Sequence, residues 1–335
     1  GTTTDIAIIA NGRAVLSQDA TQVGAWQPMV ESVRVLSIGL GGDSEVGFSG
    51  GVGLTIGPRR VVPMSLLVDN HPHLMSALLS QSKTTPSARS NRFAVPLFAT
   101  QAQYDNLTAA QQQAWETLSE GPINLSLQAM SNRPLTRSIA ELVRGGLALY
   151  SGYTPSDAAH VLGLMNHWST EAAQLATTIW QRQMRQVYGW GRRSSSDPCE
   201  IARVVHQKVI TSIVQAIMRA SLECDHPNSS KSELAALNQL VVEWIHPGKD
   251  QSSESLLSLA YDHAVSLISV GAPASSYYPQ VATVLGLELK ILEHAAVTNA
   301  IGAIVGSVIQ RERVAITQPT QGLFRVHDPN GPRDY

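Results

Sequence analysis

The chain has 335 residues, of which 43% are hydrophobic and 15% are charged, and its formal net charge is −2. A chain of this length can bury a large core and build about two domains. The near-neutral net charge excludes the strongly basic composition typical of a protein that binds nucleic acid or a membrane surface. No apolar run reaches the roughly 18 residues of a membrane-spanning helix.

Residues 1–67 are predicted to be rich in β-strands. The run Ile6–Ile9 is apolar, rich in β-branched residues and too short for a helix, which predicts a buried strand. Asn11-Gly12 follows it, and Asn-Gly between apolar runs favours a type I′ hairpin turn. A third strand is expected over residues 33–38, and a second hairpin over residues 45–56.

Residues 68–255 show mainly helical patterns, so we predict a helical insertion there. Thr154 precedes Pro155, the combination of an N-cap and a proline at the first helical position. Asp157 in the same first turn complements the helix dipole. Further N-caps are expected at Thr108 and Ser169, and long amphipathic helices over residues 171–187 and 198–222.

Residues 256–327 return to an alternation of helices and strands. The expected order is a helix at 256–263, a strand at 265–270, helices at 277–285 and 296–310 around a strand at 289–291, and strands at 314–316 and 323–326. Residues 328–335 are predicted to be a disordered tail. The two cysteines, Cys199 and Cys224, fit free thiols in a reducing compartment, so we expect a cytoplasmic protein.

Three glycine-containing turns next to strands are candidates for holding a nucleotide. Glycine lets the backbone approach an anion, and successive N–H groups suit phosphate oxygens. Asp5 and Asp43 in these turns are candidate metal ligands. For each turn the alternative is a purely structural bend. The candidate cofactor-binding residues are Gly1, Thr2, Thr3, Thr4, Gly41, Gly42, Ser44, Gly271, Ala272 and Pro273.

A second candidate metal cluster is Asp69-x-His71-x-His73. The spacing resembles that of metal ligands, but no fourth ligand follows from it, and the alternative is a solvated loop. The sequence contains neither a Gly-x-Ser-x-Gly nucleophile motif nor a Walker loop.

Five segments in the same order resemble motifs of the hydantoinase A/5-oxoprolinase family. They run from the first residue to about residue 305, which makes the resemblance more specific than any single glycine loop. The segments are Gly1–Asp5, which resembles the family's phosphate loop; Ile38–Ser44, its second glycine-rich motif; Ile56–Pro63; Gly152–Gly163; and His294–Ala303.

The resemblance implies an α/β fold, namely one half of an actin-like (ribonuclease H-like) nucleotide-binding fold with a large helical insertion. It implies an ATP- and Mg²⁺-dependent hydrolase that opens a cyclic amide, of the hydantoin or 5-oxoproline class, by phosphorylating the amide oxygen before water attacks. Asp5 and Asp43 would be the catalytic and metal-binding residues. The alternative is a subunit of a ketone carboxylase or a non-catalytic nucleotide-binding scaffold.

The sequence departs from a whole family member because it begins inside the phosphate loop. It resembles the C-terminal part of a short member, so we expect a fragment that lacks the N-terminal half of the same protein and is inactive alone. An actin-like ATP site is a cleft between two halves of the protein, and this chain would supply only one of them. We therefore expect weak ATP binding. An unpaired edge at Ile6–Ile9 would favour self-association into a homo-oligomer.

Overall fold

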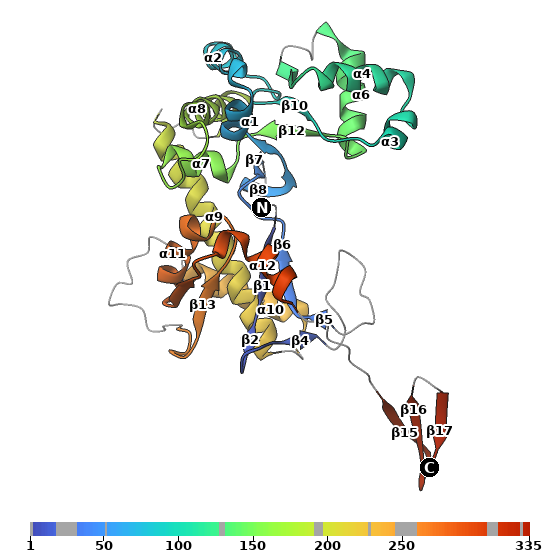
Figure 1. Ribbon diagram of the computed structural model, residues 1–335. Helices are drawn as coiled ribbons and strands as arrows, with labels where there is room; N and C mark the ends of the chain where they lie inside the picture. Colours follow the sequence, from blue (N-terminus) through green and yellow to red (C-terminus); the bar gives the residue numbers. More distant parts are fainter. Residues whose placement is uncertain are drawn as a thin grey trace, which may run out of the picture. The chain divides into compact units, whose positions relative to one another are not determined.

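A computed structural model of the chain describes residues 3–17, 32–50, 52–126, 131–190, 197–226, 229–244, 260–306, 314–328 and 331–335. These residues form a mixed α/β structure of helices and small sheets (Figure 1). The chain divides into two compact units, residues 1–296 and 297–335. Within the described ranges, no helix is long and apolar enough to cross a membrane.

The first unit opens with short strands and continues with helices. The early strands are β1 (Thr4–Ala7), β2 (Ile9–Ala10), β3 (Arg13–Ala14), β4 (Leu16–Ser17), β5 (Ser32–Val33), β6 (Val35–Ile38), β7 (Ser44–Ser49), β8 (Gly53–Arg60) and β9 (Val62–Pro63). The next elements are α1 (Met64–Asn70), a 3₁₀ turn (Pro72–Leu74), α2 (Met75–Lys83), β10 (Phe93–Pro96), α3 (Gln101–Asp105), α4 (Ala109–Ser119), β11 (Ile123–Asn124), α6 (Arg133–Arg144) and β12 (Ala148–Gly152).

The remaining helices of this unit are longer. They are α7 (Pro155–Val161), α8 (Thr170–Val187), α9 (Pro198–Asp225) and α10 (Lys231–Trp244), followed by β13 (Ser266–Ser269), α11 (Ala274–Leu285) and β14 (Glu288–Ile291). A second 3₁₀ turn (Ala295–Val297) crosses the unit boundary. The second unit contains α12 (Thr298–Val305), β15 (Ala315–Thr320), β16 (Leu323–Asp328) and β17 (Gly331–Asp334).

The early strands confirm the predicted hairpin but not the predicted burial. β2 and β3 pair across Asn11 and Gly12, whose φ angles of 52° and 73° are those that the Asn-Gly turn requires. However, Ile9 is 57% exposed. Ile9 pairs with Ala14 in the two-stranded β2–β3 hairpin, and both residues of β2 are exposed, whereas the prediction required cover on both faces.

The predicted helical insertion also contains a mixed sheet. Its order is β11-β10-β12-β9; β12 is antiparallel to β10 and parallel to β9, with Ser151 opposite Val62. On one side of it, α4 and α6 pack around a small core that includes Ile139 and Leu142, both buried. Strand β10 begins at Phe93, and Phe93 and Ala94 are fully buried and pair with β11 and β12.

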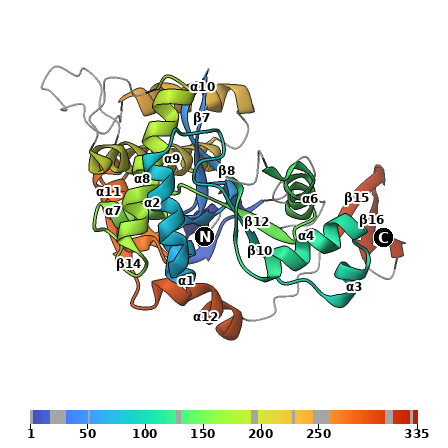
Figure 2. The ribbon, with the colours of Figure 1, turned by 90° about the horizontal axis from the view of Figure 1, so that it is seen from above.

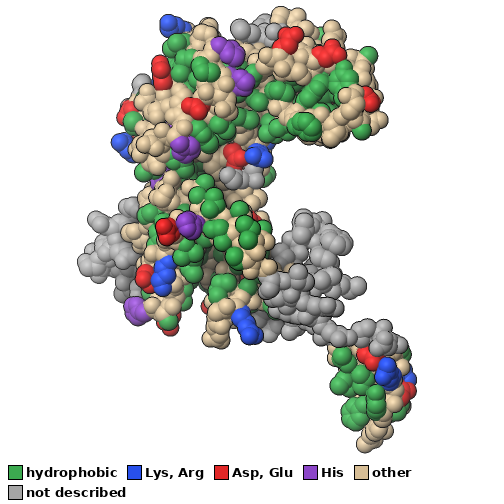
Figure 3. All heavy atoms as spheres, viewed as in Figure 1, with side chains coloured by type: hydrophobic (Ala, Val, Ile, Leu, Met, Phe, Trp, Pro, Cys, Tyr) green, Lys and Arg blue, Asp and Glu red, His purple; other side chains and the backbone are tan. Residues whose placement is uncertain are grey.

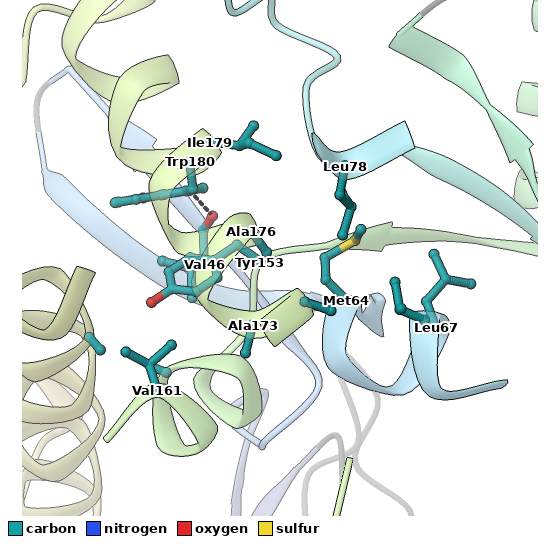
Figure 4. Close-up of a cluster of buried hydrophobic side chains, with 14 of the residues drawn as sticks. Val46, Met64, Leu67, Leu78, Tyr153, Val161, Ala173, Ala176, Ile179 and Trp180 are labelled. Carbon is teal, nitrogen blue, oxygen red and sulfur yellow. Dashed lines mark hydrogen bonds between the residues drawn. The ribbon is translucent and has the colours of Figure 1, made fainter. Parts of the chain in front are cut away.

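The largest core lies between the β7–β8 hairpin and the helices α1, α2, α7 and α8 (Figure 4). Trp180 of α8 donates its indole N–H to the Val46 carbonyl oxygen at 2.9 Å, the dashed line in Figure 4. The Tyr153 ring lies 5.4 Å from the Trp180 ring. Seen from above, α1, α2 and α7 gather along α8 (Figure 2). The Trp180 indole, whose N–H is satisfied, and the Tyr153 ring packed beside it therefore hold the hairpin on the helices.

Helix α9 connects this core with a second one. At 1.5 Å per residue its 28 residues span about 42 Å. Ile201 and Val205 near its start belong to the first core, whereas Ile210 and Ile213 further along pack with Tyr277 of α11 in the second. Ile6 and Ile38 of the β1–β6 ribbon pack against the same second core.

The buried carboxylate of Asp157 joins the N-termini of two helices. Within its own helix it forms the capping box with Thr154, accepting from the Thr154 N–H at 3.0 Å and from its hydroxyl at 2.9 Å. It also accepts from Met64 N–H, Ser65 N–H and the Ser65 hydroxyl at the start of α1, which has no other side-chain cap. Burial raises the pKa of Asp157, and these hydrogen bonds oppose that rise.

The predicted strand–helix–strand order near the end of the first unit is confirmed. β13 and β14 are parallel, with Leu267 opposite Leu289, and α11 connects them. Gly286 ends α11 in the left-handed conformation, φ 65°. In the described part of the chain these two strands pair only with each other, so the sheet does not extend to β1. Of the helix expected at 256–263, residues 260–263 are not helical and the rest lie outside the described residues.

In the second unit the prediction of a disordered tail is wrong. β16 pairs antiparallel with β15 on one side and with β17 on the other. Arg325 makes a bidentate ion pair with Asp334, with N–O distances of 2.6 and 2.8 Å. Backbone pairing and a cross-strand ion pair therefore order residues that are polar enough to resemble a tail.

The first prediction concerns the shared cap. Asp157→Asn should lower the free energy of unfolding by about 3 kcal/mol, because an amide cannot accept from all five donors and leaves buried N–H groups unpaired. Chemical unfolding measures this. The matched control is Asp105→Asn at an exposed position at the end of α3, expected to change stability by less than about 0.5 kcal/mol. Equal effects of the two substitutions would contradict the shared-cap role.

Candidate functional site

The first candidate turn places an exposed carboxylate between two hydroxyl groups. The Thr3 hydroxyl donates to one carboxylate oxygen of Asp5 at 3.0 Å, and the Ser37 hydroxyl of β6 donates to the other at 2.5 Å. Both bonds orient the carboxylate, and each oxygen retains a lone pair for a further partner. Gly1 and Thr2 lie outside the described residues.

The second candidate turn follows β6 directly and contacts the first. The Thr4 hydroxyl donates to the Leu40 carbonyl oxygen at 2.8 Å, because Thr4 lies opposite Ile38 in the β1–β6 register. The structure therefore brings together the Thr3–Asp5 turn and the Gly41–Ser44 loop, which are separated by more than 30 residues in the sequence.

Inside the Gly41–Ser44 loop, the polar groups are largely engaged with the protein. The Ser44 side chain is buried, and its oxygen accepts from the Gly41 N–H at 2.9 Å. The Gly42 carbonyl oxygen accepts from the Ser156 N–H at the start of α7, and a Cβ on Gly42 would lie 2.6 Å from the Ser156 hydroxyl. Glycine is required here because the two segments approach so closely. This requirement is the one expected if the loop is a structural bend.

Asp43 differs from Asp5 in having a strong internal partner. Its carboxylate accepts from the Arg60 guanidinium at 2.9 Å, and its side chain is 14% exposed. A cation at Asp43 would compete with this ion pair, whereas a cation at Asp5 would displace only neutral hydroxyl donors. Asp5 is therefore the better candidate metal ligand of the two.

The third candidate turn lies at the N-terminus of α11. Gly271 has φ 102°, and its N–H donates to the Ala295 carbonyl oxygen at 2.6 Å. Ala272 and Pro273 follow it, and Pro273 precedes α11 without a side-chain cap. About one helical turn further on, the Tyr278 side chain lies close to the Thr4 side chain. Among the described residues the third turn is thus related to the first only through α11.

Tyr278 is a residue of this site that the sequence patterns did not single out. Burial raises its phenol pKa; the interaction with the neighbouring Thr4 side chain opposes this rise, and the nearby charge of Asp5 adds to it. The phenol therefore stays protonated at neutral pH. Ser37 was missed as well. Their positions in the sequence could have identified both residues. Ser37 lies in the strand before the Gly41–Ser44 loop, and Tyr278 lies in the helix after the Gly271–Pro273 turn.

The second candidate metal cluster is not supported. The His71 and His73 rings meet edge to face at 5.9 Å. Among the residues that the structure describes, no group of three or more His, Cys, Asp or Glu side chains is arranged to hold a metal ion. A Mg²⁺ ion at Asp5 would accordingly need oxygen ligands from a bound phosphate, which is its usual mode of binding.

The second prediction concerns Gly57 of β8, which lies against Gly39 and Ser44 beside the Gly41–Ser44 loop. It has φ 69°, and a Cβ there would collide with the Gly39 carbonyl oxygen. Gly57→Ala should lower the free energy of unfolding by about 2–4 kcal/mol, from backbone strain plus overpacking. The matched control in the same strand is Gly53→Ala, with φ 82° but open space around it. It should cost only about 1 kcal/mol. Denaturant titration compares the two, and similar losses would show that the contact with Gly39 is unimportant.

Comparison of this chain with models of known protein families, with curated proteins and with solved structures found no match. The function of the chain is therefore inferred from its sequence motifs and from the geometry of the candidate turns.

Proposed function

We propose that this chain supplies one wall of the nucleotide site of an ATP- and Mg²⁺-dependent hydrolase that opens cyclic amides of the hydantoin or 5-oxoproline class. In this proposal the first unit corresponds to one half of an actin-like fold. The observation that carries the proposal is the hydrogen bond from the Thr4 hydroxyl to the Leu40 carbonyl oxygen. It joins the described part of the first motif, Thr3–Asp5, to the second motif, Ile38–Ser44, and both motifs resemble glycine-rich motifs of the family.

The side chains of the first turn fit a nucleotide phosphate with its metal. Asp5 is exposed, oriented by Thr3 and Ser37, and free to accept a metal ion or a metal-bound water. Mg²⁺ is typically bound through one or two carboxylates and substrate phosphates, so one well-placed carboxylate suffices on this wall. ATP would supply the phosphoryl group that activates the amide oxygen.

The roles of the other residues follow from their contacts. Thr4 holds the two turns together, and Tyr278 closes the same corner with a neutral hydroxyl. Ser44 stabilises its own loop because its hydroxyl is already engaged by Gly41. The glycine backbones at Gly41 and Gly271 keep side chains away from the space beside the turns. These residues position a ligand; the charge on this wall comes from Asp5.

The third prediction concerns the chain by itself. Because an actin-like site is a cleft with two walls, and because association costs several kcal/mol before any net affinity is gained, this chain should bind MgATP with a dissociation constant in the millimolar range. Ligand-observed NMR detects such binding. Asp5→Asn should abolish its dependence on Mg²⁺, whereas Asp105→Asn, an exposed acid elsewhere, should leave it unchanged.

Two results would contradict these expectations. A dissociation constant at or below the micromolar range would show that one wall is sufficient. No Mg²⁺-dependent binding at millimolar ATP would remove the nucleotide site itself. The reaction is tested on the longest natural form of the protein by ATP-dependent ring opening of hydantoin and 5-oxoproline. Turnover of neither ATP nor any cyclic amide would reject the hydrolase, and dependence on a second, larger subunit would favour a ketone carboxylase.

A further inference from the structure

A cavity of about 470 Å³ in the first unit is lined by five arginines. Its arginines come from strand β8, the segment before β10 and helix α6. On the face drawn in Figure 3 the charged side chains are few and scattered, as the charged fraction of 15% implies. The lining residues are Arg59, Arg89, Arg92, Arg133 and Arg137 with Thr136, Ala140, Tyr150 and Leu125.

The fold directs these arginines to one place from separate parts of the chain. Arg133, Thr136, Arg137 and Ala140 have the spacing of one face of α6. Arg59 comes from the end of β8, and Arg89 and Arg92 come from the segment that leads into β10. A solvated surface run of basic residues would be local in sequence, whereas this group is assembled by tertiary structure.

The carboxylates around the cavity do not balance its positive charge. Glu45 pairs with Arg59 at 3.2 Å and with Arg92 at 2.5 Å, and Glu141 pairs with Arg137 at 3.3 Å. Among the residues that the structure describes, Arg89 and Arg133 have no carboxylate partner. Five guanidinium groups thus face two carboxylates, which leaves an excess of three positive charges in a chain whose net charge is −2.

Arg92 adds a partly buried positive charge to this cavity. Its side chain is 20% exposed, and its guanidinium lies 5.3 Å from the centre of the Tyr150 ring. One of its terminal nitrogens, Nη1, is inaccessible to solvent and has no hydrogen-bond partner in the described structure. This atom therefore contributes positive potential to the cavity rather than a direct contact for a ligand, and a charge that is partly removed from water is screened less than a solvated one.

We propose that this cavity binds a small organic polyanion through phosphate or carboxylate oxygens. Guanidinium groups recognise such oxyanions with paired N–H donors, and the volume lies in the range of small-molecule sites. Two adjoining hollows extend it: Arg59 also lines one of about 440 Å³, and Arg133 and Arg137 line one of about 510 Å³. They give space for the uncharged part of the ligand. This site is independent of the proposed nucleotide wall.

The fourth prediction uses inorganic pyrophosphate as the probe, with citrate as the carboxylate arm, both titrated by calorimetry at constant ionic strength. The double variant Arg89→Gln/Arg133→Gln should weaken binding about tenfold or more. Both side chains are exposed and have no described carboxylate partner, so the fold should be unaffected. The control Arg13→Gln/Arg203→Gln removes the same charge at exposed positions outside the cavity and should change affinity by less than about threefold.

The outcomes separate the possibilities. Preference for pyrophosphate over citrate identifies a phosphate ligand, and the reverse identifies a polycarboxylate; both support the site. Equal weakening by the two double variants would overturn it in favour of non-specific attraction. No binding of either anion at about 5 mM would overturn it as well. Tighter, strongly salt-dependent binding of a single-stranded oligonucleotide would show a nucleic-acid surface instead of a small-molecule cavity. None of these results depends on MgATP binding at Asp5.

Discussion

The buried carboxylate of Asp157 is the constraint on which much of the first unit depends. It accepts hydrogen bonds from the first residues of α7 and of α1, so two helix N-termini share one cap. Such a carboxylate is tolerated in a core only while donors surround it. Because Ser156, the residue before it, donates its N–H to Gly42, the same helix start also holds the Gly41–Ser44 loop in place.

The candidate nucleotide wall is supported from both hydrophobic cores. Its glycine loop rests on α7, whose Ala158 and Val161 belong to the first core. Thr4 and Asp5 belong to β1, whose Ile6 packs with the second core around α9 and α11. Since α9 runs through both cores, a change in its packing would alter the alignment of the two turns that the Thr4–Leu40 hydrogen bond joins.

The β7–β8 hairpin carries two separate sets of ion pairs. Asp43, next to the start of β7, pairs with Arg60, while Glu45, two residues further on, pairs with Arg59 and Arg92 at the arginine-lined cavity. Neighbouring side chains of a strand point to opposite faces, so Arg59 and Arg60 contribute to different ion pairs. The candidate nucleotide wall and the cavity are thus built within a few residues of each other without sharing an arginine.

The sequence by itself determined the local structure where a residue type acts on its own backbone. The Asn11-Gly12 hairpin, the caps at Thr108, Thr154 and Ser169, and the β13–α11–β14 order were predictable because they follow from φ preferences, capping and periodicity. Tertiary structure alone decided that Asp157 caps a second helix, that Ile9 is exposed, that Tyr278 meets Thr4, and that five distant arginines share a cavity. These features depend on which segments pack together, and such contacts leave no periodic trace in the sequence.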